Sequence, residues 1–188
     1  MPTYILRLIP QLQLFRGDKE VSVNEVFFKW SNDYSVGIQT IDEQHQELVN
    51  ILNRLFIAVS RREGNRVIGS ILDALMSHTQ THFTLEERLM REANYKDIDS
   101  HMLVHKKLIE ELEQLSRKYM LEETPIYFEL LSFLRTWLKE HIQGCDTKYS
   151  AALQQAGFST TSWERQAKVE FASISYQKKP WWQIWQTA

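Results

Sequence analysis

Apolar residues recur three and four positions apart along four long stretches of the chain. These stretches cover residues 41–59, 68–89, 98–119 and 127–145. Residues three and four apart lie on one face of an α-helix, so each stretch predicts an amphipathic helix. The pattern therefore predicts an all-α protein built as a helical bundle.

Histidines interrupt these apolar stripes at positions where leucine or isoleucine is expected. Each predicted helix carries at least one of them: His45, His82, His101, His105 and His141. An unpaired buried polar group costs roughly 2–7 kcal/mol, whereas a whole domain is stable by only about 5–15 kcal/mol. These histidines must therefore bind one another or bind something else.

A metal ion satisfies such a cluster better than mutual hydrogen bonds do. Hydrogen bonds among histidines and a glutamate account for one or two buried imidazoles, but five leave too few acceptors. A metal site can bind ring nitrogens from all four helices at once. His82 and Glu86 are four residues apart, as are His101 and His105, so each pair projects side by side from one helix. The pattern therefore indicates a metal site inside the bundle.

Asp146 is a further candidate ligand, five residues after His141. On a regular helix this spacing places the two side chains about 140° apart. Gly144 lies between them, and a local bulge or an early helix end there would bring Asp146 round to the side of His141. We include Asp146 in the predicted ligand set on this basis.

The order of these residues resembles that of the hemerythrins, in particular their bacterial single-domain forms. Three further stretches carry the resemblance: WSNDYSVGIQTIDEQH before the first ligand, HFTLEERLM in the second helix and WLKEHIQGCD in the fourth. The resemblance implies an up-down-up-down four-helix bundle with an N-terminal arm and a C-terminal extension. Residues 1–29 form an N-terminal extension, residues 30–150 the hemerythrin-like di-iron bundle, and residues 151–188 an amphipathic, tryptophan-rich C-terminal tail. Residues 30–38 would lie across the bundle as the arm.

The resemblance also implies a cofactor of two iron ions, ferrous or ferric, joined by an oxo or hydroxo bridge. Glu86 and Asp146 would bridge the two irons with their carboxylates. The histidines divide between the irons, with His101, His105 and His141 on one and His45 and His82 on the other. The second iron then has one free position, where dioxygen would bind.

Reversible dioxygen binding is the function that this site implies, for storage or for delivery to oxygen-consuming enzymes. The chain contains no Glu-x-x-His pair, the ligand motif of the carboxylate-rich di-iron proteins. Because imidazoles donate less charge than carboxylates and disfavour high-valent iron, we expect a carrier and not an enzyme. The alternatives are an oxygen or redox sensor that acts through the tail, and iron storage or detoxification. Manganese and zinc also suit these donors.

A dry pocket would keep bound dioxygen from water. Five residues one step from the predicted ligands can line it or can be ordinary core residues: Ile41, Leu89, Trp137, Leu138 and Ile142. His78 lies one turn before His82, where the family commonly carries a tyrosine. It can act beside the ligands, serve as an eighth ligand, or be a core histidine bonded to a backbone carbonyl or a neighbouring side chain. We favour the core histidine.

Composition narrows the remaining possibilities. The net charge is −2, so the chain has no basic stripe for nucleic acid. The single cysteine, Cys145, rules out an intramolecular disulfide and suits a reducing cytosol. The apolar start of the chain has Arg7 and Pro10 inside it and no small-residue cleavage site, so we expect no signal peptide. No apolar run approaches the roughly 18 residues of a membrane span. We therefore expect a cytoplasmic protein.

The tail lies beyond the resemblance. Trp163, Ala167, Phe171 and Ile174 recur in it at helical spacing, and the chain then closes with KKPWWQIW. Lysine and tryptophan side chains favour a membrane surface, which would make the protein peripheral at a membrane. The same residues can instead dock on a partner that receives oxygen, pack back on the bundle or pair two copies. The sequence leaves these placements open.

Overall fold

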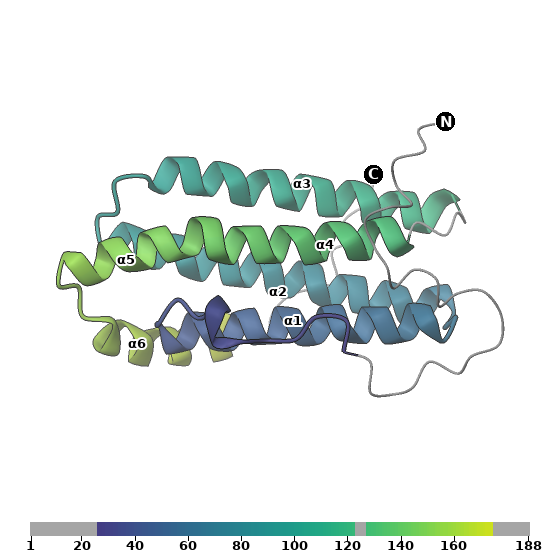
Figure 1. Ribbon diagram of the computed structural model, residues 1–188, viewed down its shortest axis with the longest axis horizontal. Helices are drawn as coiled ribbons and strands as arrows, with labels where there is room; N and C mark the ends of the chain where they lie inside the picture. The colour runs from purple at the N-terminus through teal and green to yellow at the C-terminus, as the bar shows by residue number, and fades with distance from the viewer. Residues whose placement is uncertain (1–25, 123–126, 175–188) are drawn as a thin grey trace.

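Four long helices form the body of the molecule in this computed structural model, which describes residues 26–122 and 127–174 (Figure 1). They are α1 (Gln39–Ser60), α2 (Asn65–Glu92), α3 (Ile98–Glu122) and α4 (Tyr127–His141). Each helix runs opposite to the one before it, and short connections join α1 to α2 and α2 to α3 (Figure 1). The predicted all-α, up-down-up-down four-helix bundle is confirmed.

Apolar side chains from the predicted stripes fill the space between the helices. Ile41, Leu55, Leu89 and Leu112 are completely buried there. Full burial of a side chain of this size contributes roughly 1.5–3 kcal/mol. Because isolated helices are only marginally stable in water, packing of these apolar faces is what holds the helices in place.

The segment of residues 26–38 comprises the described end of the N-terminal extension and the predicted arm, and it runs along α1 (Figure 1). It contains the short 3-10 helix η3 (Asn32–Tyr34). Three apolar side chains of the arm are buried in the bundle core: Phe28, Val36 and Ile38. The backbone N–H of Val36 also donates a 2.8 Å hydrogen bond to Asp42, which fixes the arm to the first turn of α1. Residues 1–25 of the predicted extension lie outside the described residues.

A π-helix interrupts the helix that carries His141. The chain passes from α4 into η4 (Ile142–Asp146) and continues as α5 (Thr147–Gln155). Hydrogen bonds in a π-helix join residues five apart instead of four, so residues at this spacing come onto one side. Gly144 lies within η4. Of the two possibilities that the sequence left open at this glycine, the structure has the bulge.

The described part of the tail folds back on the bundle. Helix α6 (Thr160–Ile174) packs against α1 and α2, and Trp163 and Ala167 are buried in the same core as the bundle residues (Figure 1). The remaining tail, residues 175–188 with the KKPWWQIW segment, lies outside the described residues. Within the described part of the chain, no helix has both the length and the apolar character needed to cross a membrane.

Candidate metal centre

The seven predicted ligand residues come together in the interior of the bundle. Each is at most 6% exposed. They are His45 of α1, His82 and Glu86 of α2, His101 and His105 of α3, His141 of α4 and Asp146 of η4. Side chains as far as 101 residues apart in the sequence therefore share one buried site.

Three histidines and Glu86 form the first group of this site. Glu86, His101, His105 and His141 each offer a ligand atom, and all four atoms lie within 4.8 Å of one another. Nε2 of His105 is 2.9 Å from Nε2 of His101 and 3.2 Å from Nε2 of His141. Imidazole lone pairs this close repel one another unless a proton or a cation lies between them. The geometry thus suits a cation.

Two histidines form the second group, again with Glu86. The ligand atoms of His45, His82 and Glu86 lie within 4.8 Å of one another. Oε2 of Glu86 is 3.7 Å from Nε2 of His82 and 3.3 Å from Nε2 of His105, so this oxygen lies near both groups. A carboxylate placed in this way can bridge two metal ions.

Asp146 also faces both groups. Its Oδ2 is 3.4 Å from Nε2 of His45, and its Oδ1 is 3.1 Å from Nε2 of His141 and 3.5 Å from Nε2 of His101. The π-helix η4 places it there, because the extra residue in the turn offsets the rotation that a regular helix would give. The structure thus provides a second carboxylate that can bridge two ions.

Unpartnered polar atoms indicate that this site holds a group. Both ring nitrogens of His45 and of His82, Oε2 of Glu86 and both carboxylate oxygens of Asp146 are buried without a hydrogen-bond partner. Each such atom destabilises a fold unless something binds it. Five imidazoles and two carboxylates suit first-row metals such as iron, manganese or zinc. The residues present therefore fit a pair of metal ions.

Burial keeps most of the cluster histidines neutral. It lowers the pKa of His45, and it lowers the pKa values of His82 and His141 well below the ordinary range, despite the opposing charge of Glu86. His105 differs, because burial lowers its pKa but the neighbouring carboxylates of Glu86 and Glu87 outweigh burial and raise it. Metals bind the neutral imidazole, so burial prepares His45, His82 and His141 as ligands.

The pKa values of the two carboxylates shift in opposite directions. Burial and the charge of Glu86 raise the pKa of Asp146 well above its usual range. Burial also opposes ionisation of Glu86, but the surrounding histidines, His82 first, hold its pKa well below the usual range. Glu86 is therefore the carboxylate of the cluster that ionises more readily.

Two residues at this site were missed by the sequence analysis. Tyr149 is completely buried and donates a 2.6 Å hydrogen bond from its hydroxyl to Oε1 of Glu86. Burial and the charge of Glu86 raise the pKa of Tyr149 well above its ordinary value, so the hydroxyl keeps its proton. Its position three residues after Asp146 could have indicated that it faces the site. Glu87, which contacts His105, carries no such signal because it reads as a surface residue beside Glu86.

The predicted pocket residues lie in two places. Ile41, Leu89 and Ile142 are completely buried in the packed core. Trp137 and Leu138 instead border a small cavity of about 20 Å³. Its other lining residues are mostly leucines, and four of the lining residues lie three positions from a cluster histidine: Leu48, Thr79, Leu108 and Leu138. This cavity therefore lies next to the cluster and is mainly apolar.

His78 has the contacts of a core histidine. Its Nε2 donates a 3.1 Å hydrogen bond to the backbone carbonyl of Gln44, the residue before His45. Burial lowers the pKa of His78, although this hydrogen bond opposes the change. The bond joins α2 to the turn of α1 that presents His45.

Known proteins resemble this chain in sequence and in fold. Residues 36–153 match the family model of the hemerythrin HHE cation binding domain. The chain is 33% identical over 121 residues to a bacteriohemerythrin of Stenotrophomonas maltophilia (strain R551-3), a match that covers 64% of this chain and 78% of that protein. It is 31% identical over 127 residues to a bacteriohemerythrin of Pseudomonas aeruginosa (strain LESB58), covering 68% and 82%. A solved structure of wild-type hemerythrin matches with a TM-score of 0.60 at 30% identity, covering 67% of this chain and 97% of that one. All seven cluster residues lie within the span that the family model matches.

Proposed function

The chain belongs to the hemerythrin family, and on this basis we propose that it binds dioxygen reversibly at a pair of iron ions. One observation carries the proposal: five imidazoles and two shared carboxylates converge in a buried site. Two overlapping groups of ligand atoms support two ions in place of one. When bound, the iron pair supplies the electrons that reversible dioxygen binding needs, and the chain supplies everything else.

We assign the ligands by their distances. His101, His105 and His141 would hold one iron, and His45 and His82 would hold the other. Glu86 and Asp146 are shared, because each lies near histidines of both groups. The two-histidine side has fewer protein donors and is the side on which we place dioxygen.

Aromatic rings shield the site from water. The ring of Phe83 stacks on His105 with centroids 3.6 Å apart, and the ring of Trp137 stacks on His141 with centroids 4.4 Å apart. Water that reached the site would supply protons, and the bound dioxygen would then leave in a reduced form instead of as dioxygen. Exclusion of water therefore favours release of dioxygen unchanged.

The physiological role we propose is oxygen storage or delivery in the cytoplasm of a bacterium, without catalysis. An imidazole-rich ligand set supports binding over substrate oxidation, because imidazoles donate less charge than carboxylates. The partner would be an oxygen-consuming enzyme, or a membrane surface that the tail contacts. In either case the contact would be made by residues 178–185, which are rich in lysine and tryptophan.

A second candidate is an oxygen or redox sensor. The observation that favours it is the packing of α6 against α1 and α2, the helices that carry His45, His82 and Glu86. A change at the irons could thus reach the tail through two helices. A sensor predicts a tail whose cleavage by a protease differs between the oxygenated and oxygen-free protein, whereas a carrier predicts equal cleavage.

The visible spectrum tests the main proposal. Protein loaded with ferrous iron without oxygen is exposed to air and then purged, over several cycles, and its iron content is measured. We expect two irons per chain and a charge-transfer band that appears and disappears with each cycle. A single irreversible change to a ferric spectrum would contradict reversible binding and favour a sensor or an iron-handling role.

A further inference from the structure

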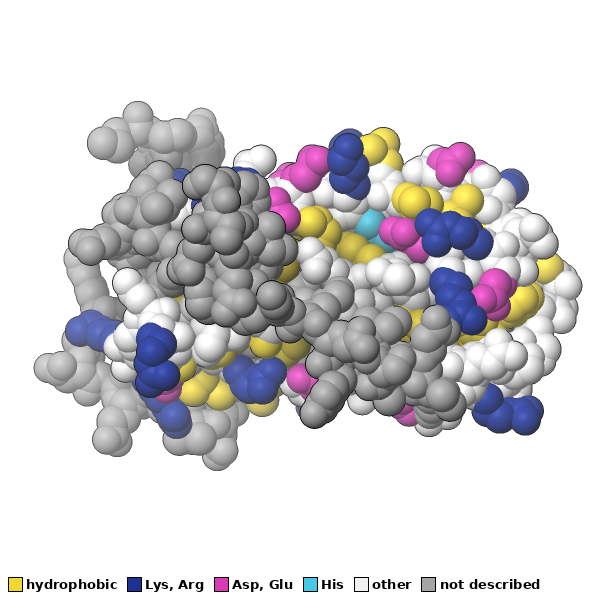
Figure 2. All heavy atoms as spheres, turned by 180° about the vertical axis from the view of Figure 1, so that it is seen from behind, with side chains coloured by type: hydrophobic (Ala, Val, Ile, Leu, Met, Phe, Trp, Pro, Cys, Tyr) yellow, Lys and Arg dark blue, Asp and Glu magenta, His cyan; other side chains and the backbone are white. Residues whose placement is uncertain are grey.

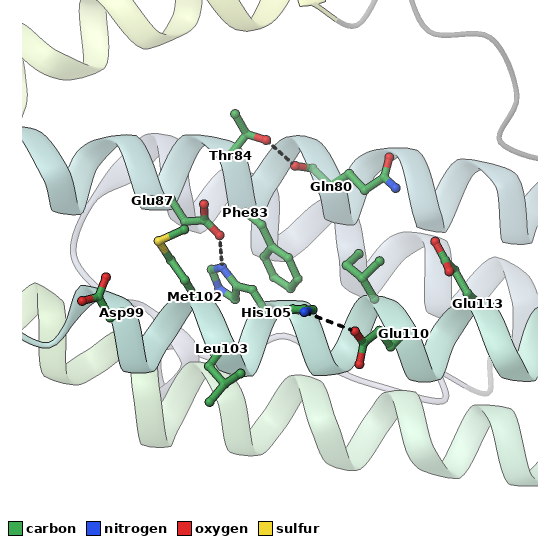
Figure 3. A pocket seen from close by; sticks show the side chains of 12 residues that line it. Gln80, Phe83, Thr84, Glu87, Asp99, Met102, Leu103, His105, Glu110 and Glu113 are labelled. Carbon is green, nitrogen blue, oxygen red and sulfur yellow. Dashed lines mark hydrogen bonds and ion pairs between the residues drawn. The ribbon is translucent and has the colours of Figure 1, made fainter. Parts of the chain in front are cut away.

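His105 is held differently from other histidines of the cluster. Its Nε2 lies near His101 and His141, while its Nδ1 donates a 3.0 Å hydrogen bond to Oε1 of Glu87 (Figure 3). The corresponding Nδ1 atoms of His45, His82 and His141 are buried and have no hydrogen-bond partner. A carboxylate on the outer ring nitrogen therefore sets His105 apart from these three.

The position of Glu87 follows from the geometry of α2. Neighbouring residues on a helix point about 100° apart, so Glu86 and Glu87 face different sides of α2. Glu86 is completely buried, whereas the Glu87 side chain is 18% exposed at a surface groove of about 700 Å³ between α2 and α3. Figure 2 shows part of one histidine side chain, visible between acidic and basic side chains on this face of the molecule. His105 and Glu87 both line this groove.

Two further contacts fix the pair. Oε2 of Glu87 lies 3.3 Å from Nη2 of Arg91, one turn along α2, while Oε1 accepts from His105. The carboxylate is thus held at both oxygens. The Phe83 ring lies parallel to the His105 ring, with an angle of 3° between their planes. His105 is consequently fixed at its face by Phe83 and at its outer edge by Glu87.

We propose that Glu87 is a positioning residue that orients His105 and strengthens its bond to the metal. By accepting the Nδ1 proton, the carboxylate holds the tautomer whose lone pair is on Nε2, the atom that faces the cluster. It also draws the Nδ1 proton toward itself, which makes Nε2 a stronger electron donor. A stronger donor binds the metal more tightly and favours its oxidised state. The inference rests on the proposed iron site and adds a residue that tunes it.

Two substitutions at this position separate charge from hydrogen bonding. Glu87→Gln removes the charge but keeps an oxygen that accepts the Nδ1 proton, whereas Glu87→Ala removes both. Glu92→Gln is the matched control, because Glu92 makes an ion pair of the same spacing on α2, at 2.7 Å to Arg88. Arg91→Gln tests whether the outer contact of the carboxylate contributes.

The experiment measures iron affinity and reduction potential on the full chain. Ferrous iron is titrated without oxygen against a coloured chelator, and the midpoint potential of the loaded protein is then determined. We expect Glu87→Ala to weaken iron binding by about 10–100-fold, as loss of such an outer partner typically does. We expect both Glu87 variants to shift the midpoint potential to more positive values, and Glu92→Gln to match the parent. A merely structural role would not shift the potential of Glu87→Gln.

The parent protein distinguishes the two proposals. If it binds two irons and releases dioxygen, while both Glu87 variants match Glu92→Gln in affinity and potential, the role of Glu87 is wrong and the function stands. If the parent takes up no iron pair, the proposed function itself is wrong. Should Glu87→Ala fail to fold, the potential of Glu87→Gln decides, since an unshifted value overturns the inference.

Discussion

The Tyr149 hydroxyl donates a 2.6 Å hydrogen bond to Oε1 of Glu86, across 63 positions of sequence. The bond joins the helix after the π-turn to the carboxylate at the centre of the cluster. A hydrogen bond to a charged group contributes roughly 1.5–3 kcal/mol. Tyr149 therefore holds Glu86 in the orientation from which it reaches both groups of histidines.

Tyr149→Phe should lower the free energy of unfolding by roughly 1.5–3 kcal/mol, because it removes this bond while it keeps the ring. Glu86 also becomes freer to turn, so we expect the variant to lose iron to a chelator faster than the parent. Urea unfolding and the rate of iron loss measure the two effects. Tyr95→Phe, at a less buried tyrosine 6.4 Å away between ring centroids, is the control. Equal behaviour of the two variants would show that the hydroxyl of Tyr149 has no such role.

Insertion of an alanine after Gly144 should turn Asp146 away from the site. The insertion places Asp146 six residues after His141, and each added helical residue rotates the residues that follow by about 100°. We expect the insertion variant to keep its helical circular dichroism but to bind fewer than two irons per chain. Gly144→Ala is the control, since an added Cβ there has open space around it. If the insertion variant still holds two irons, the register that η4 sets is not needed to place Asp146.

Trp137→Ala should leave the iron content unchanged and speed autoxidation. The ring of Trp137 covers His141 and borders the small apolar cavity, so its removal admits water to the site. Phe133→Ala, which removes a ring one turn earlier on α4, controls for the general loss of an aromatic side chain. The rate at which the oxygenated spectrum decays is the measurement. Equal decay rates in the two variants would show that Trp137 does not shield the site.

Trp163→Ala should destabilise the whole domain, although Trp163 belongs to α6 and not to one of the four bundle helices. Trp163 is 3% exposed within the bundle core, and truncation of a buried tryptophan typically costs about 3–5 kcal/mol. We expect one cooperative urea transition at a lower midpoint, and the curves measured by fluorescence and by circular dichroism should coincide. Trp163→Phe should recover most of the loss. A separate early transition of α6 would show that this helix is not part of the cooperative unit.

Removal of iron should destabilise the protein, because the buried nitrogens and oxygens of the cluster then lack a partner. A ligand at a free concentration of 100 times its Kd stabilises the folded state by about 2.7 kcal/mol. We therefore expect an excess of ferrous iron to raise the urea midpoint, and a chelator to reverse the rise. His141→Ala removes one ligand and should reduce both the iron content and this stabilisation. An iron-independent midpoint in the parent would argue against a metal centre.

The parts of this protein that the sequence predicts are those set by helical periodicity. The stripes that contain Ile41 and Leu89 predict the buried faces of their helices, because the period of an α-helix is a local property of the backbone. The same period pairs His82 with Glu86 before any tertiary contact is known. The histidines stand out because leucine or isoleucine is expected at their positions, so burial without a partner already implies a ligand.

The helical period does not predict which residues of different helices contact one another. Glu87 reads as one more surface carboxylate until α2 and α3 pack and bring it to 3.0 Å from His105. His78 could have faced the metal ligands, and the packing of α1 on α2 gives it the carbonyl of Gln44 instead. Each of these roles depends on which two helix faces meet, and the spacing within one helix says nothing about that.

The sequence by itself thus determined the helices, their buried faces and the residues able to bind metal, since each depends on neighbours within a few positions of the chain. Only the tertiary structure decided that Gly144 lies in a π-bulge, that Tyr149 holds Glu86, and that α6 covers α1 and α2. These outcomes depend on packing between segments far apart in sequence, where the free energy of the whole core selects among local alternatives of similar energy.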